Sequence, residues 1–573
     1  MAHTDIKASS GQLTVSGFGG LDCTARFHTG AAKMRNFRIL SDGSLEKRCG
    51  YRSVYALKGP VRGVWEGTMG GDSYLFAVGS STVYRQAPED GTLVAIYHLS
   101  TDTDPVTFLF YRDQLYLFDG ASVLIYRPAL RTFTVADGYT PLYGKGWHPT
   151  SMGDVNEPLN MIQNRIRIHY LNTSASTVFR LPFTAKRIDR LLINGNTVSN
   201  FGFSAGSASF TIPTEQTVHR EVEVAVTLDD AFDRRSATLR NSYATLYTDP
   251  YRESVMIFGG VPYLAHHTRK VTDSMVAADA RFYINSDPLY FPEGCTFAVG
   301  SAQQPITEIR QYNSQALIFN DRSIWAVRYP SPESDEPEIS LLHTGTGCSS
   351  CRGTAACNDQ IVTVHIGGIT LMRSPPNQPN TILTTQISEP ILRDMEWDFF
   401  KRAKLYNDRS SNQLLVFDPS DAEHRIWVYD MTHERWFCYD SIPANRFFEL
   451  NGVTAFSTND GRVCIFDETQ EYDEGDYIAA YYQSHYLEPL ATDDFNRTLQ
   501  VALCADTSCA PLTLELETEN TKKSFTLHGI GSNAPELFRF RASMGRFRFL
   551  RYRIISDAVE RCRVHFITFS ANN

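Results

Sequence analysis

The chain has 573 residues, of which 42% are hydrophobic and 21% charged, so it is long enough to bury the cores of two to four globular domains. Its net charge of −10 argues against a protein whose main task is to grip nucleic acid, because such proteins usually carry a basic surface. The sequence contains no run of eighteen apolar residues and begins without an apolar core, so it predicts neither a membrane span nor a secretory signal.

The composition favours strands throughout. Aromatic residues make up 12% of the chain, with 35 Phe and 28 Tyr, and they suit the half-buried surface of a sheet. Short alternating runs cut by Gly, Asp, Asn and Pro fill nearly the whole sequence, which is typical of strands and tight turns. Apolar spacing near the helical period is confined to residues 389–405, which form either one short helix or a decorated loop. The sequence therefore predicts an all-β protein.

The first elements in chain order lie in residues 36–51, where two strands flank a turn at Ser41-Asp-Gly43. We expect this hairpin to close a propeller by supplying a strand, with its Lys and Arg side chains facing outward.

A hairpin pattern then recurs: a polar turn, an apolar strand, a Gly, Asp or Asn turn, and a second strand. Its copies occupy residues 72–85, 113–127, 313–328, 359–372, 412–430 and 451–467. From residue 313 onward the copies are roughly 40 to 55 residues apart, close to the range of propeller repeats. The pattern favours a β-propeller of five to seven divergent blades, and a β-sandwich or a string of small β domains is the alternative.

The expected domain order follows from where these copies are interrupted. Residues 1–143 would hold the N-terminal strands and first blades, and 144–247 an inserted β domain, because loop tips tolerate insertions. Residues 248–467 would hold the remaining blades, 468–476 an acidic linker, and 477–573 a C-terminal β domain.

Catalytic chemistry is not predicted. The sequence lacks an H-E-x-x-H motif and a phosphate-binding P-loop. The stretch from Ser457 to Cys464 approaches a sialidase Asp box but has Asn459 where Asp is needed and no Trp. We therefore expect no enzyme and no cofactor.

One cysteine cluster contains residue types that bind zinc. Cys348-Ser-Ser-Cys351 is followed by Cys357 and His365, but a structural zinc site normally has a second close pair. A cysteine-rich turn or a disulfide within the cluster is the favoured interpretation, and no metal is predicted.

The richest electrostatic feature is Phe538-Arg-Phe-Arg541, followed by Arg546-Phe-Arg-Phe-Leu-Arg-Tyr-Arg553. Strict alternation over residues 546–549 predicts a strand with Arg on one face and Phe on the other. Three interpretations of this row are open: a solvated face, a contact with DNA, and a contact with an acidic segment of a neighbouring subunit. The candidate interface residues are Arg539, Arg541, Arg546 and Arg548 with Asp467, Glu468, Glu471, Asp473, Glu474 and Asp476.

The opening of the chain carries a family resemblance. Gly17-Phe-Gly-Gly-Leu-Asp-Cys23 precedes Lys33-Met-Arg-Asn-Phe-Arg-Ile-Leu-Ser-Asp-Gly-Ser-Leu-Glu-Lys-Arg-Cys-Gly-Tyr51. This resembles the start of phage tail nozzle, tail hub and related DNA-stabilising propeller proteins. There an Asn-aromatic pair and a Gly turn lead to Leu-x-x-Arg-Pro-Gly, and here Cys49 stands where Pro is usual. The motif covers about 35 residues, and the order of parts extends the likeness loosely over the chain.

The resemblance implies a structural virion protein of a phage tail, synthesised in the host cytoplasm and not inserted into a membrane. Such proteins form a homo-oligomeric ring, commonly a hexamer, below the portal and adaptor. The ring carries tail fibres and lets viral DNA pass without sequence-specific binding. The alternative is a receptor- or glycan-binding propeller at the tail tip, in which Trp427 and Trp436 would serve as sugar-stacking platforms.

Overall fold

A computed structural model describes residues 6–9, 12–15, 17–24, 30–102, 105–173, 176–213, 220–250, 252–259, 270–273, 287–300, 304–331, 334, 336–375, 381–487, 498–508, 510–531 and 534–571. The chain divides into two compact units. Unit 1 combines Met1–Val61 with Thr346–Asn573, and unit 2 is Arg62–Gly345. Among the described residues, no helix has both the length and the apolar character needed to cross a bilayer.

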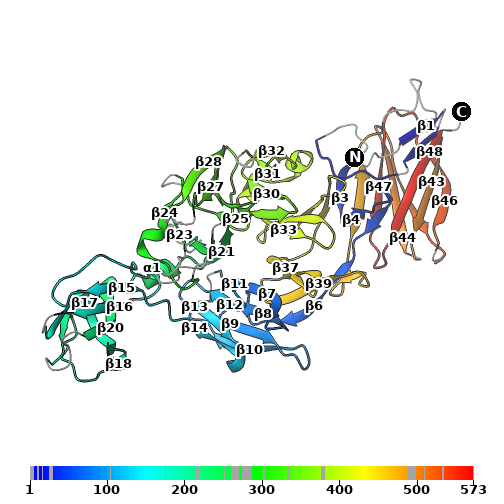
Figure 1. Cartoon of the computed structure of the whole chain (residues 1–573). Helices are drawn as coiled ribbons and strands as arrows, with labels where there is room; N and C mark the ends of the chain where they lie inside the picture. The colour runs from blue at the N-terminus through cyan, green and yellow to red at the C-terminus, as the bar shows by residue number, and fades with distance from the viewer. Residues whose placement is uncertain are drawn as a thin grey trace. The chain divides into compact units, whose positions relative to one another are not determined.

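Seven four-stranded sheets account for most of the described strands, and in six of them the strands follow one another in chain order (Figure 1). Four of them are β7 (Val61–Met69), β8 (Asp72–Gly79), β9 (Thr82–Gln86), β10 (Leu93–His98); β11 (Thr107–Tyr111), β12 (Gln114–Phe118), β13 (Val123–Arg127), β14 (Thr132–Val135); β21 (Tyr243–Thr248), β22 (Glu253–Phe258), β23 (Lys270–Asp273), β24 (Thr296–Ala298); and β25 (Glu308–Tyr312), β26 (Gln315–Phe319), β27 (Ser323–Arg328), β28 (Glu338–Thr344). The other three are β29 (Thr354–Cys357), β30 (Gln360–His365), β31 (Gly368–Arg373), β32 (Leu383–Gln386); β33 (Lys404–Asp408), β34 (Gln413–Phe417), β35 (Ile426–Asp430), β36 (Arg435–Tyr439); and β37 (Arg446–Leu450), β38 (Val453–Ser457), β39 (Arg462–Asp467), β6 (Gly50–Ala56).

These sheets are the blades of a β-propeller, which confirms the predicted fold class. Strand β12 shows why the sequence folds this way. Leu115 and Leu117 belong to one core and Tyr116 and Phe118 to the next, so both faces of the strand are packed. A strand buried on both faces must be apolar at consecutive positions, which is the run that the repeated hairpins contain.

The last blade takes its fourth strand from the N-terminal region. Strand β6 pairs antiparallel with β39, with Gly50 opposite Asp467 and Ala56 opposite Arg462. The strand that completes the last blade is therefore β6, which comes directly after the predicted hairpin in the chain. That hairpin, β4 (Phe37–Ile39) and β5 (Leu45–Lys47), pairs instead with β48 (Arg563–Ala571). The expectation that its cations face outward is wrong, because Lys47 and Arg48 are buried.

The C-terminal β domain is a sandwich that includes the first strands of the chain. A seven-stranded sheet contains β1 (Ile6–Ser9), β2 (Gln12–Val15), β48, β43 (Thr498–Asp506), β46 (Glu536–Ser543), β4 and β5, and a five-stranded sheet contains β3 (Ala31–Arg35), β42 (Ala480–Ser484), β47 (Leu550–Ser556), β44 (Pro511–Thr518) and β45 (Lys522–His528). Alternate residues of β43 and β44 are buried. The domain therefore differs from the expected division into 1–143 and 477–573, because the N-terminal strands complete both C-terminal sheets.

In unit 2, a six-stranded sheet interrupts the blades between β14 and β21 (Figure 1). Its strands are β15 (Leu142–Trp147), β16 (Arg165–Asn172), β17 (Val178–Ile193), β18 (Asn196–Thr197), β19 (Ser207–Thr211) and β20 (Arg220–Leu228). It ends at Leu228 and is followed by η3 (Asp230–Phe232) and α1 (Arg235–Leu239), so the expected inserted domain of 144–247 runs too far by including most of β21.

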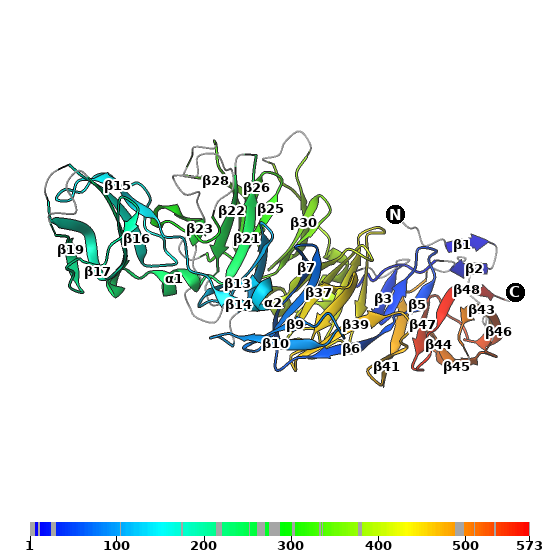
Figure 2. The same cartoon turned by 60° about the horizontal axis from the view of Figure 1, so that its bottom comes forward.

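Two further segments differ from expectation. Residues 389–405 hold a short 3-10 turn, η5 (Glu389–Asp394), the helix α2 (Trp397–Arg402) and the beginning of β33. The expected acidic linker of 468–476 instead contains a small hairpin, β40 (Tyr472–Asp473) and β41 (Asp476–Tyr477). Figure 2 shows β41 at a projecting edge of unit 1, between the last blade and the sandwich.

Candidate functional site

The family-like motif forms a buried polar junction in unit 1. Asn36 lies between β3 and β4 with φ of 55°, and its side chain makes four hydrogen bonds. Its Oδ1 accepts from Arg48 Nε at 2.8 Å and from the backbone N–H of Asp440 at 3.0 Å. Its Nδ2 donates to Asp440 Oδ1 at 2.5 Å and to the carbonyl of Ala479 at 2.8 Å. The Asn of the motif thus ties the sandwich to the blade that ends at β36.

Arg48 is the centre of this junction, with 2% of its surface exposed. It pairs with both oxygens of Asp473, at 2.9 and 2.5 Å, and donates to the carbonyls of Cys49 and Asp440. A buried guanidinium is tolerated when a bidentate carboxylate and further acceptors satisfy its donors. The Leu-x-x-Arg part of the motif therefore has a structural role.

The same segment holds the β40–β41 hairpin. The backbone N–H of Gly50 donates to the carbonyl of Gln470 at 2.9 Å, and that of Glu474 donates to Tyr51 at 3.3 Å. A Cβ at Gly50 would lie only 2.0 Å from the carbonyl oxygen of Tyr472, so only glycine allows this approach. Together with the Arg48–Asp473 pair, these contacts fix the base of the hairpin.

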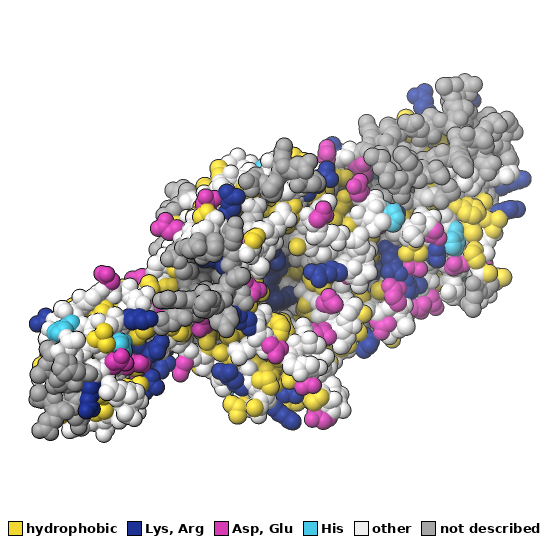
Figure 3. Space-filling view, viewed as in Figure 1, with side chains coloured by type: hydrophobic (Ala, Val, Ile, Leu, Met, Phe, Trp, Pro, Cys, Tyr) yellow, Lys and Arg dark blue, Asp and Glu magenta, His cyan; other side chains and the backbone are white. Residues whose placement is uncertain are grey.

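The structure agrees with the predicted arginine row for residues 538–541, which lie in strand β46. In β46, Arg539 and Arg541 are exposed, while Phe538 and Phe540 pack against the sandwich core. Strand β46 ends the path of its sheet, and Figure 3 shows cations beside an apolar patch on this part of the sandwich.

The strand predicted over residues 546–549 is wrong. This segment is a turn whose backbone N–H groups, those of Arg548 and Phe549, donate to the carboxylate of Glu519. The alternation still places Arg546 and Arg548 outward and buries Phe547.

Most of the acidic interface candidates contact other arginines of unit 1. Asp467 pairs with Arg52 at 2.9 Å, and hydrogen bonds from Thr469 and Arg52 lower its pKa to about 2. Glu468 pairs with Arg38 and Arg561, Glu471 accepts from the backbone of Arg561, Asp473 pairs with Arg48, and Glu474 pairs with Arg462. Asp473 is buried and hence unavailable to a neighbouring subunit, whereas Asp476 is exposed.

The cysteine cluster is engaged within its own blade. The thiol of Cys348 donates to the carbonyl of Ser350 at 3.0 Å, and burial raises the pKa of Cys357 to about 11. The two ring nitrogens of His365 contact Thr370 and the backbone N–H of Gly367. Cys351 is partly exposed, and the cysteines among the described residues are free thiols. No group of three or more His, Cys, Asp or Glu in the described ranges could hold a metal ion.

Two other sequence features are placed clearly. Trp427 and Trp436 each have 1% of their surface exposed, so they belong to the blade core and cannot stack on a sugar. Gly202-Phe-Ser-Ala-Gly206 matches the G-x-S-x-G pattern of hydrolases. Ser204 lies in an exposed turn that leads into β19, whereas the hydrolase elbow leads from a strand into a helix.

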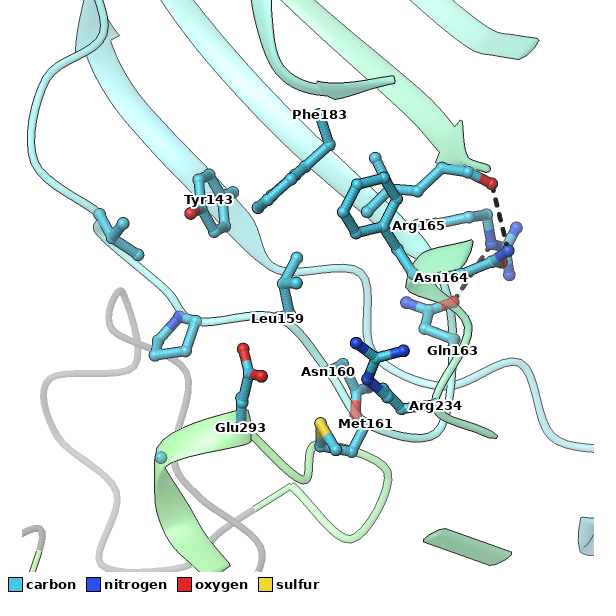
Figure 4. A pocket seen from close by; sticks show the side chains of 15 residues that line it. Tyr143, Leu159, Asn160, Met161, Gln163, Asn164, Arg165, Phe183, Arg234 and Glu293 are labelled. Atoms are coloured by element: carbon cyan, nitrogen blue, oxygen red, sulfur yellow. Dashed lines mark hydrogen bonds between the residues drawn. The ribbon is translucent and has the colours of Figure 1, made fainter. Parts of the chain in front are cut away.

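Sequence reasoning missed a cavity of about 530 Å³ at the base of the inserted sheet in unit 2 (Figure 4). Its apolar wall includes Tyr143 of β15 and Phe183 of β17, whose ring centroids are 5.4 Å apart. Arg234 and Glu293 provide charge at its other side. The spacing of these residues in the sequence, over 150 positions, gives no signal that they meet.

A second, more polar cavity of about 780 Å³ shares Gln163, Asn164 and Arg165 with the first. Its lining includes four arginines and one aspartate, namely Arg165, Arg187, Arg235, Arg240 and Asp137. The shared part is held rigid, because Gln163 donates to Thr140 Oγ1 at 2.9 Å and accepts from Arg165 at 3.1 Å. The cavity is therefore a preformed basic recess.

Comparisons with known proteins found similar folds only. No family model matches the chain, and no curated protein matches it. Solved structures with similar arrangements include the AfRom2 CNH domain, at 9% identity and a TM-score of 0.36, covering 73% of this chain and 99% of that one. BBS1N, solved in complex with ARL6DN, has 9% identity and a TM-score of 0.33, covering 74% and 98%. An exo-β-1,3-galactanase from Phanerochaete chrysosporium has 7% identity and a TM-score of 0.23, covering 91% and 100%. Because each TM-score is below 0.5, the fold assignment rests on the strand order of the sheets.

Proposed function

We propose that this chain is a structural, non-enzymatic component of a bacteriophage tail. It would be the subunit of a nozzle or hub, forming a homo-oligomeric ring that conducts viral DNA and supports fibres or adjoining tail proteins. The ring is commonly sixfold in the proteins that the opening motif resembles. Partners would be further copies of the chain, a portal or adaptor, and tail fibres.

The observation that carries this proposal is the position of the motif. Asn36, Arg48 and Gly50 stand at the meeting point of the last blade, the sandwich and the β40–β41 hairpin. A residue pattern shared with tail proteins thus coincides with the contacts that join three parts of unit 1. Such a junction suits a protein that must keep its shape under mechanical load.

The net charge of −10 supports a conduit rather than a nucleic-acid clamp. Phosphates bind proteins mainly through Lys and Arg, and affinity grows with the number of contacts. A mildly acidic chain lets DNA slide past without being retained.

Immunogold electron microscopy of intact phage particles tests the proposal, with an antibody raised against this chain and a peptide digest of the same particles. We expect gold at the tail and peptides of the chain in the digest. Particles without label and without these peptides would overturn the proposal.

A second candidate is a receptor- or glycan-binding protein at the tail tip. The specific observation in its favour is the first cavity, where aromatic rings face charged side chains across a volume suited to a small ligand. A glycan array probed with the full chain tests it, with Phe183→Ala as the variant. Specific glycans bound by the parent and lost in the variant would favour this candidate, and an empty array would reject it.

A further inference from the structure

The β40–β41 hairpin presents an unusual surface. Tyr472 is 42% exposed and Tyr477 is 60% exposed, and Glu474 and Asp476 lie between them. Large apolar rings that are exposed next to carboxylates are typical of a contact surface, because aromatic side chains are enriched at interface centres. Glu474 pairs with Arg462, so the hairpin offers a partner two exposed rings and the carboxylate of Asp476. Figure 2 shows β41 of this hairpin at a projecting edge of unit 1.

The hairpin is also preorganised. Its second residue, Asp473, is buried against Arg48, and its first strand lies against Gly50 so closely that a Cβ would not fit. Binding through a rigid tip loses less conformational entropy than binding through a loop that must first become ordered. The junction built by the motif thus has a second consequence, which is to hold this tip in place.

The arginine-lined cavity of unit 2 has complementary chemistry. Arg240 is exposed and makes no ion pair with any residue that the structure describes, while Arg165 pairs with Asp137 at 3.1 Å. Arg235 pairs with Asp233 at 3.4 Å, and Arg187 pairs with Asp189 at 2.7 Å. Figure 3 shows cations gathered beside α1, at the end of the inserted sheet. Once these three pairs are formed, the recess retains the positive charge of Arg240.

An apolar contact lies in the same recess. Val135, at the end of β14, lines the cavity and is 61% exposed. A tyrosine ring could cover Val135 and stack on a guanidinium, while the neighbouring carboxylate of Asp476 pairs with arginine in a bidentate way. A volume of about 780 Å³ is ample for a tyrosine side chain with an adjacent acid.

We propose that the β40–β41 hairpin of one copy inserts into the arginine-lined cavity of a second copy. The inference deepens the homo-oligomeric assembly of the proposed function and rests on it. The two surfaces are different patches of the chain, so the contact is heterologous, and repeating it generates a closed ring if the rotation closes.

Site-specific photocrosslinking of the full-length chain tests this contact. The photoreactive residue p-benzoylphenylalanine replaces Tyr477 in one population, which is mixed at high concentration with an isotope-labelled population lacking it. We expect covalent dimers that join residue 477 to labelled peptides from residues 120–138, 162–165 or 235–240. An absence of mixed dimers, or dimers joined elsewhere, would overturn the proposal.

Charge exchange provides the second measurement. Asp476→Arg and Arg240→Asp should each lower the dimer yield about tenfold, and the two together should restore it, because opposite charges face each other again. Glu423→Arg and Arg180→Glu are the matched controls, since both side chains are exposed and lie outside the hairpin and the cavity lining. If the dimer yield falls in both single variants and is not restored in the double variant, the proposed contact is contradicted as well.

The two proposals fail separately. Gold label at the tail with no crosslink at the cavity would keep the tail function and reject this contact. Crosslinked rings from a chain that is absent from particles would keep the contact and reject the tail function.

Discussion

Two arginine-bearing stretches of the chain differ in whether their cations are buried or exposed. In residues 33–51, Lys47 and Arg48 are buried, and Arg48 is paired with a carboxylate and three oxygens besides. In residues 538–553, Arg539 and Arg541 point to solvent from an outer strand. Both stretches alternate cations with apolar residues, and both look alike as sequence.

The difference lies in what each stretch meets. Asp473, the partner of Arg48, is 425 positions away in the chain and is brought near by the closure of the last blade. The outer face of β46 meets no such element in its sheet, whose path ends there. Charge patterning therefore fixes the side of a strand on which a cation lies, and the tertiary structure decides whether that side is buried.

The largest change in stability is expected from removing the buried guanidinium of Arg48. We expect Arg48→Met to destabilise unit 1 by about 3–5 kcal/mol, because Asp473 is then left buried without a counter-charge. Urea unfolding followed by hydrogen–deuterium exchange measures this separately for each unit. The double variant Arg48→Met with Asp473→Leu should recover part of the loss. A cost below about 1 kcal/mol for the single variant would show that the pair is not held as described.

A smaller effect is expected where the motif contacts the hairpin backbone. Gly50→Ala places a methyl group against the carbonyl of Tyr472, and overpacking of this kind costs about 1–3 kcal/mol. Faster amide exchange in residues 470–477 should accompany it. Gly294→Ala is the control, because a Cβ there meets nothing within 4 Å. Equal behaviour of the two variants would refute the close approach.

A third test concerns Lys404, a half-buried cation without a bidentate carboxylate. Burial, with the nearby guanidinium groups of Arg352 and Arg446, lowers the pKa of Lys404 to about 8. Lys404→Met should therefore stabilise unit 1 at pH 7, by about 1–2 kcal/mol, opposite in sign to Arg48→Met.

The pH dependence follows from the direction of that shift. The folded-state pKa lies below the unfolded value near 10.5, so the charged side chain opposes folding fully below about pH 8. As the pH rises from about 8 to 10.5, the parent gains stability and the advantage of the variant disappears. Unfolding curves of both proteins over this range check the prediction, and an advantage that grows with pH would contradict it.

The smallest effect is expected on the exposed row. Arg539→Glu with Arg541→Glu should change the stability by no more than about 0.5 kcal/mol, because both side chains are solvated. Sedimentation velocity at low and high salt shows whether the row serves assembly. Self-association that depends on salt and is lost in this variant would add the row to the contacts between copies, and unchanged association would leave it a solvated face.

Local structure was predictable from the sequence. Alternation and turn residues predicted the strands of hairpins such as β12–β13 and β34–β35, because these signals depend on neighbours only a few positions away. The interruption between β14 and β21 likewise predicted an inserted sheet, although its end was placed too late. Of the candidate site, the sequence supplied the motif and the acidic stretch but not their connection.

The pairing of distant segments became visible in the folded chain. The N-terminal strands β1–β5 complete sheets formed by the last hundred residues, and β6 completes the last blade. The Arg48–Asp473 pair and the arginine-lined cavity arise from these and similar long-range contacts. The physical reason is that strand pairing and burial depend on which apolar faces remain uncovered in the whole fold, and no local pattern records that.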